Sequence, residues 1–248
     1  MRRLLTAGFG AFLAWEMLAA SAAAQGLLIH ETERVPLPRP VVRGRPAPPM
    51  RYKIKELAVN ARILDQVARV QVGQSFVNTG SRQMEVSFIF PLPYDGAVDR
   101  LTFLVDGKEY PAKLLSAKEA RRIYETHVRR NQDPALLEWI GTGMFQTSVF
   151  PVPAGAERTV TLRYSQLLRK DHDLTDFLFP LATAKYTSAP VEKVQITASI
   201  ESSIEIKSVY SPTHAIDVKR PHSTSAVVSY SVENQVPTGD FRLFFSVA

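Results

Sequence analysis

The apolar residues of this chain recur mainly at every second position, which is the period of a β-strand. From residue 53 onward, two such runs are separated by Asp65-Gln66, which offers a turn, and the second run stops at NTGS, residues 78–81. The apolar positions of the two runs are Leu57, Val59, Ala61, Ile63, Val70, Val72 and Phe76. The pattern predicts two antiparallel strands.

The same alternation continues further along the chain. In MEVSFIFPLP it ends at two prolines, and in LTFLVDGKEYPAKL it is broken by Asp106-Gly107, the positive-φ pair of a hairpin turn. The later runs are TVTLRYSQLL, VEKVQITASI, IEIKSVY, AVVSYSV and FRLFFSVA. The positions expected to share a face within a run are Met84, Val86, Phe88 and Phe90, then Val160, Leu162 and Tyr164, then Val194, Ile196, Ala198 and Ile200.

One segment has helical spacing instead. Ser116 and Glu119 form a capping box at the start of a predicted helix, about residues 116–131. Its apolar face carries Ala120, Ile123, Tyr124 and Val128, and its other face carries Lys118, Arg121, Arg122, Arg129 and Arg130. The predicted fold class is therefore mainly β, an antiparallel sandwich-like module with one inserted α-helix, followed by further antiparallel strands.

The two ends of the chain have their own patterns. Residues 1–24 combine two arginines, an apolar run and a stretch of small residues, as in a cleaved secretory signal. A membrane anchor is the alternative, but Glu16 interrupts the apolar run that a spanning helix needs. Residues 25–49 predict an extended linker rich in proline and arginine, or a proline-rich ligand for another protein. Because the last strand is apolar up to Ala248, we expect more polypeptide after it.

The amino-acid composition and the motifs exclude several kinds of chemistry. The chain has no cysteine, which excludes disulfides, thiol catalysis and cysteine-ligated metals. Its net charge of +6 is modest and its basic residues are interspersed with acids, so we expect no nucleic-acid partner. Serine-nucleophile and nucleotide-binding motifs are absent, and we predict no catalytic residue, no cofactor and no metal site. The sequence DHD, residues 171–173, is interpreted as a polar loop, with a metal site as the alternative.

The segment DPALLEW, residues 133–139, contains two carboxylates that a glycosidase would need at one cleft. Its proline can instead begin a helical turn capped by Asp133, which would point the leucines and Trp139 toward the sheet. We therefore interpret the segment as a hydrophobic plug that anchors the helix, with Glu138 at its rim.

The basic face of the helix also has two interpretations. Clustered guanidinium groups bind anionic glycans or phospholipid headgroups, but the neighbouring acids favour a solvated face with pairs within the helix. The candidate interaction or structural residues of helix and plug are Arg121, Arg122, Tyr124, Glu125, Arg129, Asp133, Leu137, Glu138 and Trp139.

The order of these motifs resembles one family. FIFPLP, VDG, AKEARRIYE, DPALLEW and VFPVPAGAERTVTLRYSQLL follow one another as in the vault protein inter-alpha-trypsin (VIT) domain, over roughly residues 50–182. The resemblance implies a non-catalytic β-rich module that precedes a von Willebrand type A domain in exported bacterial proteins. The Asp-x-Ser-x-Ser metal motif of that second domain is absent from the chain. Residues 183–248 resemble the β-rich segment that lies between the two domains.

The expected function is therefore protein–protein or surface interaction by an exported, periplasmic or extracellular protein, the N-terminal part of a VIT and von Willebrand A protein. Its partner would be a protein or a cell-surface component, and no transmembrane segment would remain after signal cleavage. The alternative is an exported glycan-binding or glycan-active β-sandwich, in which Trp139 and Tyr164 would stack on sugars.

Overall fold

The computed structural model describes residues 27–30, 52–91, 101–110, 112–115, 118, 144–147, 150–181 and 190–248. The expected signal, most of the linker, the DPALLEW segment and the helix at about 116–131, apart from Lys118, lie outside the described residues. The helix and the plug therefore stay predictions. In the described ranges, no helix is long and apolar enough to cross a membrane.

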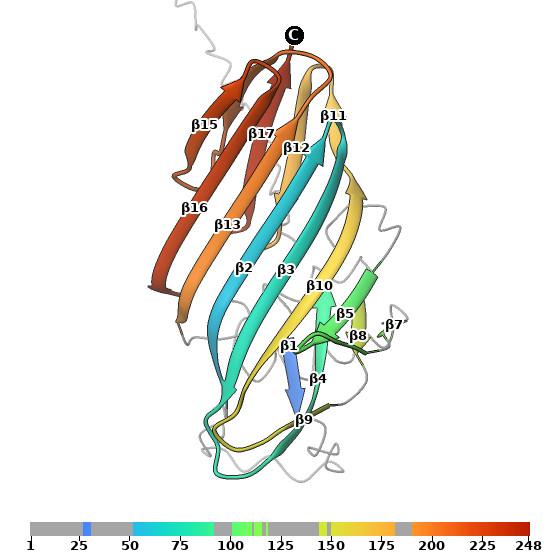
Figure 1. Ribbon diagram of the computed structural model, residues 1–248, viewed down its shortest axis with the longest axis vertical. Coiled ribbons are helices and arrows are strands. Elements are labelled where there is room, and N and C mark those ends of the chain that lie inside the picture. The colour runs from blue at the N-terminus through green and yellow to red at the C-terminus, as the bar shows by residue number, and fades with distance from the viewer. Residues whose placement is uncertain are drawn as a thin grey trace, which may run out of the picture.

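The described residues form three β-sheets (Figure 1). In spatial order, the eight-stranded sheet contains β15 (Asp217–His222), β16 (Ser225–Gln235), β13 (Val191–Glu201), β2 (Tyr52–Leu64), β3 (Val67–Asn78), β10 (Glu157–Leu167), β5 (Leu101–Val105) and β6 (Lys108–Tyr110). The four-stranded sheet contains β11 (Arg169–Asp171), β12 (Leu174–Phe179), β17 (Phe241–Val247) and β14 (Ile206–Tyr210). The third contains β1 (Leu27–His30), β4 (Met84–Pro91), β8 (Met144–Thr147) and β7 (Ala112–Leu115), with β9 (Phe150–Val152) paired to β4.

Both smaller sheets pack on one side of the large sheet. The ring of Phe76 on β3 lies 6.5 Å from that of Phe150 on β9, between the large sheet and the five-stranded sheet. At the other end of the molecule, Tyr230 on β16 lies 6.0 Å from Phe241 on β17. The buried residues of all three sheets form one continuous core, so the predicted sandwich-like, mainly β fold is confirmed.

The alternating positions predicted from the sequence face this core. Leu57, Val59, Ala61 and Ile63 of β2 are at most 2% exposed, and the predicted faces of β4, β10 and β13 are likewise buried. The hairpin turn predicted at Asp106-Gly107 is also confirmed, because both residues have positive φ, 49° and 81°. Each fully buried large apolar side chain contributes about 1.5–3 kcal/mol to folding, so the alternating apolar positions supply the burial that stabilises the core.

One strand pairing differs from the expected antiparallel arrangement. β13 lies beside β2 in parallel, with Lys193 opposite Glu56 and Glu201 opposite Leu64. Through this pair the strands β13, β16 and β15 continue the sheet that β2 and β3 begin (Figure 1). Parallel neighbours need a long connection, which here is the whole segment from β3 to β12.

Candidate functional site

The side of the large sheet that faces away from the smaller sheets carries the most distinctive surface of the described residues. Since successive side chains of a strand point to opposite faces, the burial of every second residue in β2, β3, β10 and β13 turns the others outward. We call this surface the outer face, and it consists of Asn60, Arg62, Leu64, Val67, Arg69, Gln71, Arg163, Ser165, Leu167, Thr197 and Ser199.

Strand register arranges the outer face in three rows. The antiparallel pairing of β2, β3 and β10 places Leu64, Val67 and Leu167 in one row, Arg62, Arg69 and Ser165 in the next, and Asn60, Gln71 and Arg163 in the third. The parallel strand β13 adds Ser199 to the second row and Thr197 to the third. The outer face therefore has an apolar end and a basic middle.

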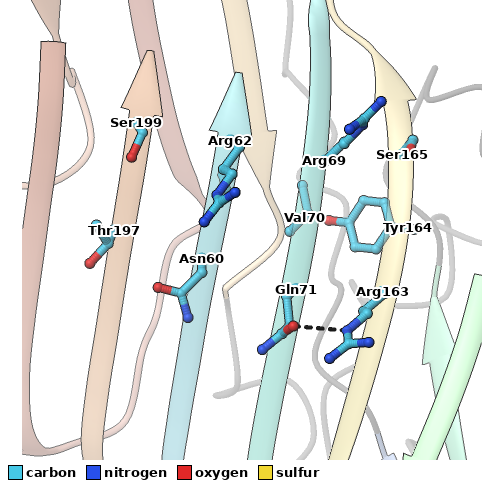
Figure 2. A pocket seen from close by; sticks show the side chains of 11 residues that line it. Asn60, Arg62, Arg69, Val70, Gln71, Arg163, Tyr164, Ser165, Thr197 and Ser199 are labelled. Carbon is cyan, nitrogen blue, oxygen red and sulfur yellow. Dashed lines mark hydrogen bonds between the residues drawn. The ribbon is translucent and has the colours of Figure 1, made fainter. Parts of the chain in front are cut away.

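The second and third rows line an open hollow of about 760 Å³ (Figure 2). Its outward side chains are arginines, amides and hydroxyls from four neighbouring strands. The Nε atom of Arg163 donates a hydrogen bond of 2.8 Å to Oε1 of Gln71, drawn as a dashed line in Figure 2. This bond fixes the position of the Arg163 guanidinium and leaves its terminal N–H groups for a ligand.

The arginines of the hollow differ in their ion pairing from the other basic residues of the same sheet. Lys53 lies 2.7 Å from Glu192, and Lys55 lies 3.1 Å from Glu157. The hydrogen bond from Lys55 to Glu157 raises the pKa of Lys55, and the one from Lys53 lowers the pKa of Glu192. Within the described part of the chain, the ion pairs within 4.0 Å include none made by the three arginines in the hollow. Among the described residues, the hollow therefore carries a local excess of positive charge.

The apolar row at the end of the outer face is exposed. Leu64, Val67 and Leu167 have exposed fractions of 60%, 45% and 57%, although they are large hydrophobic residues. Glu201 flanks this row, opposite Leu64. Contiguous apolar side chains beside polar ones are typical of binding surfaces, whereas a single exposed leucine would mean little.

Turns at the end of the sheet hold this apolar row in place. Asp65, which has a positive φ of 51°, accepts hydrogen bonds from the backbone N–H and the hydroxyl of Ser203, at 2.8 and 3.0 Å. Its own backbone N–H donates to the carbonyl of Glu201, and the N–H of Leu168 donates to the carbonyl of Gln66. The backbone hydrogen bond from Ser203 lowers the pKa of Asp65. The row thus lies at an edge of the sheet whose turns are tied together by hydrogen bonds.

The site residues predicted from the sequence lie elsewhere in the chain. Arg121, Arg122, Tyr124, Glu125, Arg129, Asp133, Leu137, Glu138 and Trp139 all lie outside the described residues. The outer face was not predicted because the basic residues outside the helix were interpreted only from the net charge and from the acids between them. The sequence does contain a signal for part of this face. Counting outward on both sides of the turn at Asp65-Gln66 places Arg62 opposite Arg69.

Two other interpretations can be compared with the structure. Tyr164 is 3% exposed and its ring lies 5.9 Å from that of Phe90, so the alternative in which it stacks on sugars is wrong for this residue. Its position in the alternation of β10 turns it into the core. In the DHD sequence Asp171 ends β11, and His172 and Asp173 form the polar turn before β12. Across the described ranges, no cluster of three or more histidine or acidic residues could hold a metal ion.

The fold and the outer face together define a β-sandwich module with an exposed surface that is part basic and part apolar. Residues 54–164 match the model of the Vault protein inter-alpha-trypsin domain, as the sequence motifs predict. The resemblance to the VIT domain is thus confirmed over these residues. The matched residues include all three arginines of the hollow.

Similar proteins include much longer ones. Human von Willebrand factor A domain-containing protein 5A is 31% identical over 122 residues, which are 48% of this chain and 16% of that protein. Human protein mono-ADP-ribosyltransferase PARP4 is 24% identical over 215 residues, 79% of this chain and 12% of that protein. The chain thus spans under a fifth of either relative.

A solved structure shows a similar fold. A Legionella pneumophila protein, provisionally named a nutrient-binding protein, has a TM-score of 0.60 at 11% sequence identity. The alignment covers 91% of this chain and 72% of that one, so the likeness extends beyond the VIT domain into the strands that follow it. At this identity the likeness concerns the fold alone.

Proposed function

We propose that this chain is a non-catalytic protein–protein interaction module, and that the outer face is its contact surface. The observation that carries the proposal is the row of Leu64, Val67 and Leu167 beside arginines without carboxylate partners in the described structure. Interfaces bury apolar side chains at their centre and are enriched in arginine, and both kinds of residue are exposed here on neighbouring strands of one sheet.

The chemistry of the hollow supports a binding role in place of catalysis. Its lining, as far as the structure describes it, offers guanidinium, amide and hydroxyl groups, which donate hydrogen bonds, but no histidine or carboxylate to act as a general base. Ser165, Ser199 and Thr197 therefore have no neighbour in the hollow that would activate their hydroxyl groups.

We further propose that the module is exported and forms the N-terminal part of a longer protein with a von Willebrand type A domain. The signal-like residues 1–24 support export to the periplasm or the cell exterior. The name of the human relative, which contains a von Willebrand factor A domain, supports the second part. In this proposal residues 25–49 are a linker, residues 50–182 the VIT domain and residues 183–248 a β-rich segment that continues into it.

The contact surface is tested by a photo-cross-linking amino acid at position 60, in the hollow, in the organism that makes the protein. The control carries it at position 207, an exposed residue on β14 of the four-stranded sheet. A protein adduct from position 60 alone supports the proposal, and its absence there contradicts it. N-terminal sequencing of the cell-envelope form tests export, which predicts a chain that begins at Gln25.

A further inference from the structure

Resting on the proposed function, we infer that the outer face binds an acidic protein segment that carries apolar residues next to its carboxylates. The carboxylates would lie in the hollow against Arg62, Arg69 and Arg163, and the apolar residues would cover Leu64, Val67 and Leu167.

The positive charge of the arginines in the hollow favours an acidic partner. Arg62 and Arg69 lie directly opposite each other on adjacent strands, an arrangement in which like charges destabilise a sheet. Because no described carboxylate neutralises them, a ligand that brings carboxylates would relieve the repulsion as it binds. A guanidinium group also presents a planar fork of N–H donors that matches a carboxylate.

The spacing of the rows favours a partner segment that carries both acidic and apolar side chains. Positions two residues apart along a strand are separated by about 6.6 Å, so the apolar row lies one such step from the first arginine row. A single short segment that runs along the strands can therefore reach both rows. A ligand with charge alone would leave Leu64 and Leu167 exposed.

The lining argues against two other classes of anion. Single-stranded nucleic acids and many glycans bind proteins through aromatic platforms, and the aromatic residue at the hollow, Tyr164, is buried beneath the sheet. Phosphate-rich or sulfated ligands would use the arginines but would gain nothing from the apolar row.

The test is a binding titration of the full chain with a fluorescein-labelled peptide that joins a short glutamate block to a short leucine block. A lysine–leucine peptide and a glutamate–serine peptide are the matched probes, because each changes one of the two features. We expect the glutamate–leucine peptide to bind at least about tenfold more tightly than either, and its affinity to fall as salt is added. Equal binding of the three peptides would overturn the inference.

Two charge-reversal variants of the chain test whether the peptide binds at the hollow. Arg62→Glu reverses a charge in the hollow and should keep the fold, because it places a carboxylate opposite Arg69. We expect it to weaken binding of the glutamate–leucine peptide at least about tenfold, whereas Lys207→Glu, the same charge change on the other sheet, should leave binding within about twofold. An unchanged affinity of Arg62→Glu would contradict the inference.

Other ligand classes are measured in parallel. A heparin oligosaccharide or a vesicle of phosphatidylglycerol that binds more tightly than the peptide, and loses binding in Arg62→Glu, would overturn the acidic-protein assignment. If position 60 forms a protein adduct in cells while the peptide does not bind, this inference is wrong and the proposed function stands. If position 60 forms no adduct, the proposed function itself is contradicted.

Discussion

Arg62 on β2 lies directly opposite Arg69 on β3, with Ser165 and Ser199 at the two ends of the same row. Elsewhere on this sheet lysines have carboxylate partners, such as Glu192 for Lys53. Like charges at opposite positions of a β-pair reduce stability, so the arginine pair is a local cost in the isolated chain. An acidic binding partner would offset this loss of stability, so the arginine pair is consistent with a binding role.

The first prediction follows from this repulsion. Arg62→Thr should increase the free energy of unfolding by about 0.2–1 kcal/mol, because it removes the like charge and introduces a residue that favours strands. Urea unfolding at low salt measures the change. Surface repulsion is screened by salt, so the gain should shrink in high salt. A variant that is less stable than the parent at low salt would show that the pair is not repulsive.

The second prediction concerns the core between the large sheet and the five-stranded sheet. Phe76 is fully buried and its ring contacts those of Tyr52 and Phe150. Phe76→Ala should cost about 3–5 kcal/mol of stability, because it removes apolar contacts and leaves a cavity. Leu167→Ala is the matched control, since this side chain is 57% exposed, and it should change stability by less than about 0.5 kcal/mol. A similar loss in both variants would argue that Leu167 is covered.

The third prediction concerns a buried hydroxyl. Burial raises the pKa of Tyr164, and its hydroxyl has no hydrogen-bond partner among the described residues. Because an unsatisfied buried polar group is destabilising, Tyr164→Phe should leave the free energy of unfolding unchanged or raise it by up to about 1–3 kcal/mol. Chemical denaturation measures this directly. A marked loss of stability would reveal a partner for the hydroxyl.

The fourth prediction is a pH dependence at the turn beside the apolar row. The backbone N–H of Ser203 lowers the pKa of Asp65, so the charged carboxylate contributes stability above its unfolded pKa of about 3.9. This contribution should be lost as pH falls through the lowered folded pKa. Asp65→Asn keeps a residue that tolerates the positive φ of 51° and removes the charge.

The comparison of this variant with the parent chain isolates the carboxylate. Asp65→Asn should be less stable than the parent at pH 7, and the difference should disappear at acidic pH, below the folded pKa of Asp65. Urea unfolding at a series of pH values gives both curves. A difference that stays constant down to the lowest pH would mean that the charge of Asp65 makes no contribution.

Local pattern predicts much of this fold because the period of a strand determines which residues face the core. The β2–β3 hairpin, the buried face of β4 and the turn at Asp106-Gly107 all follow from neighbouring residues. The parallel pairing of β13 with β2 does not, since their partners are more than 100 positions apart, as for Lys193 and Glu56. Such pairings depend on the packing of the whole core, which periodicity does not describe.

The outer face shows the same limit. The opposition of Arg62 and Arg69 is fixed by the turn between their strands, and it can be found by counting from Asp65-Gln66. Arg163 and Leu167 lie beside these residues only because β10 pairs with β3. That pairing joins residues about ninety positions apart in the sequence, such as Arg163 and Gln71. A surface assembled from distant strands is therefore hidden in the sequence until the sheet order is known.

The most direct test of this account compares photo-cross-linking yields at positions 60 and 207 in cells that make the protein. The account predicts a discrete protein adduct at position 60, little or none at position 207, and a lower yield at position 60 when Leu167→Ser removes part of the apolar row. Equal yields at the two positions, or no adduct at position 60, would contradict the claim that the outer face is where a partner protein binds.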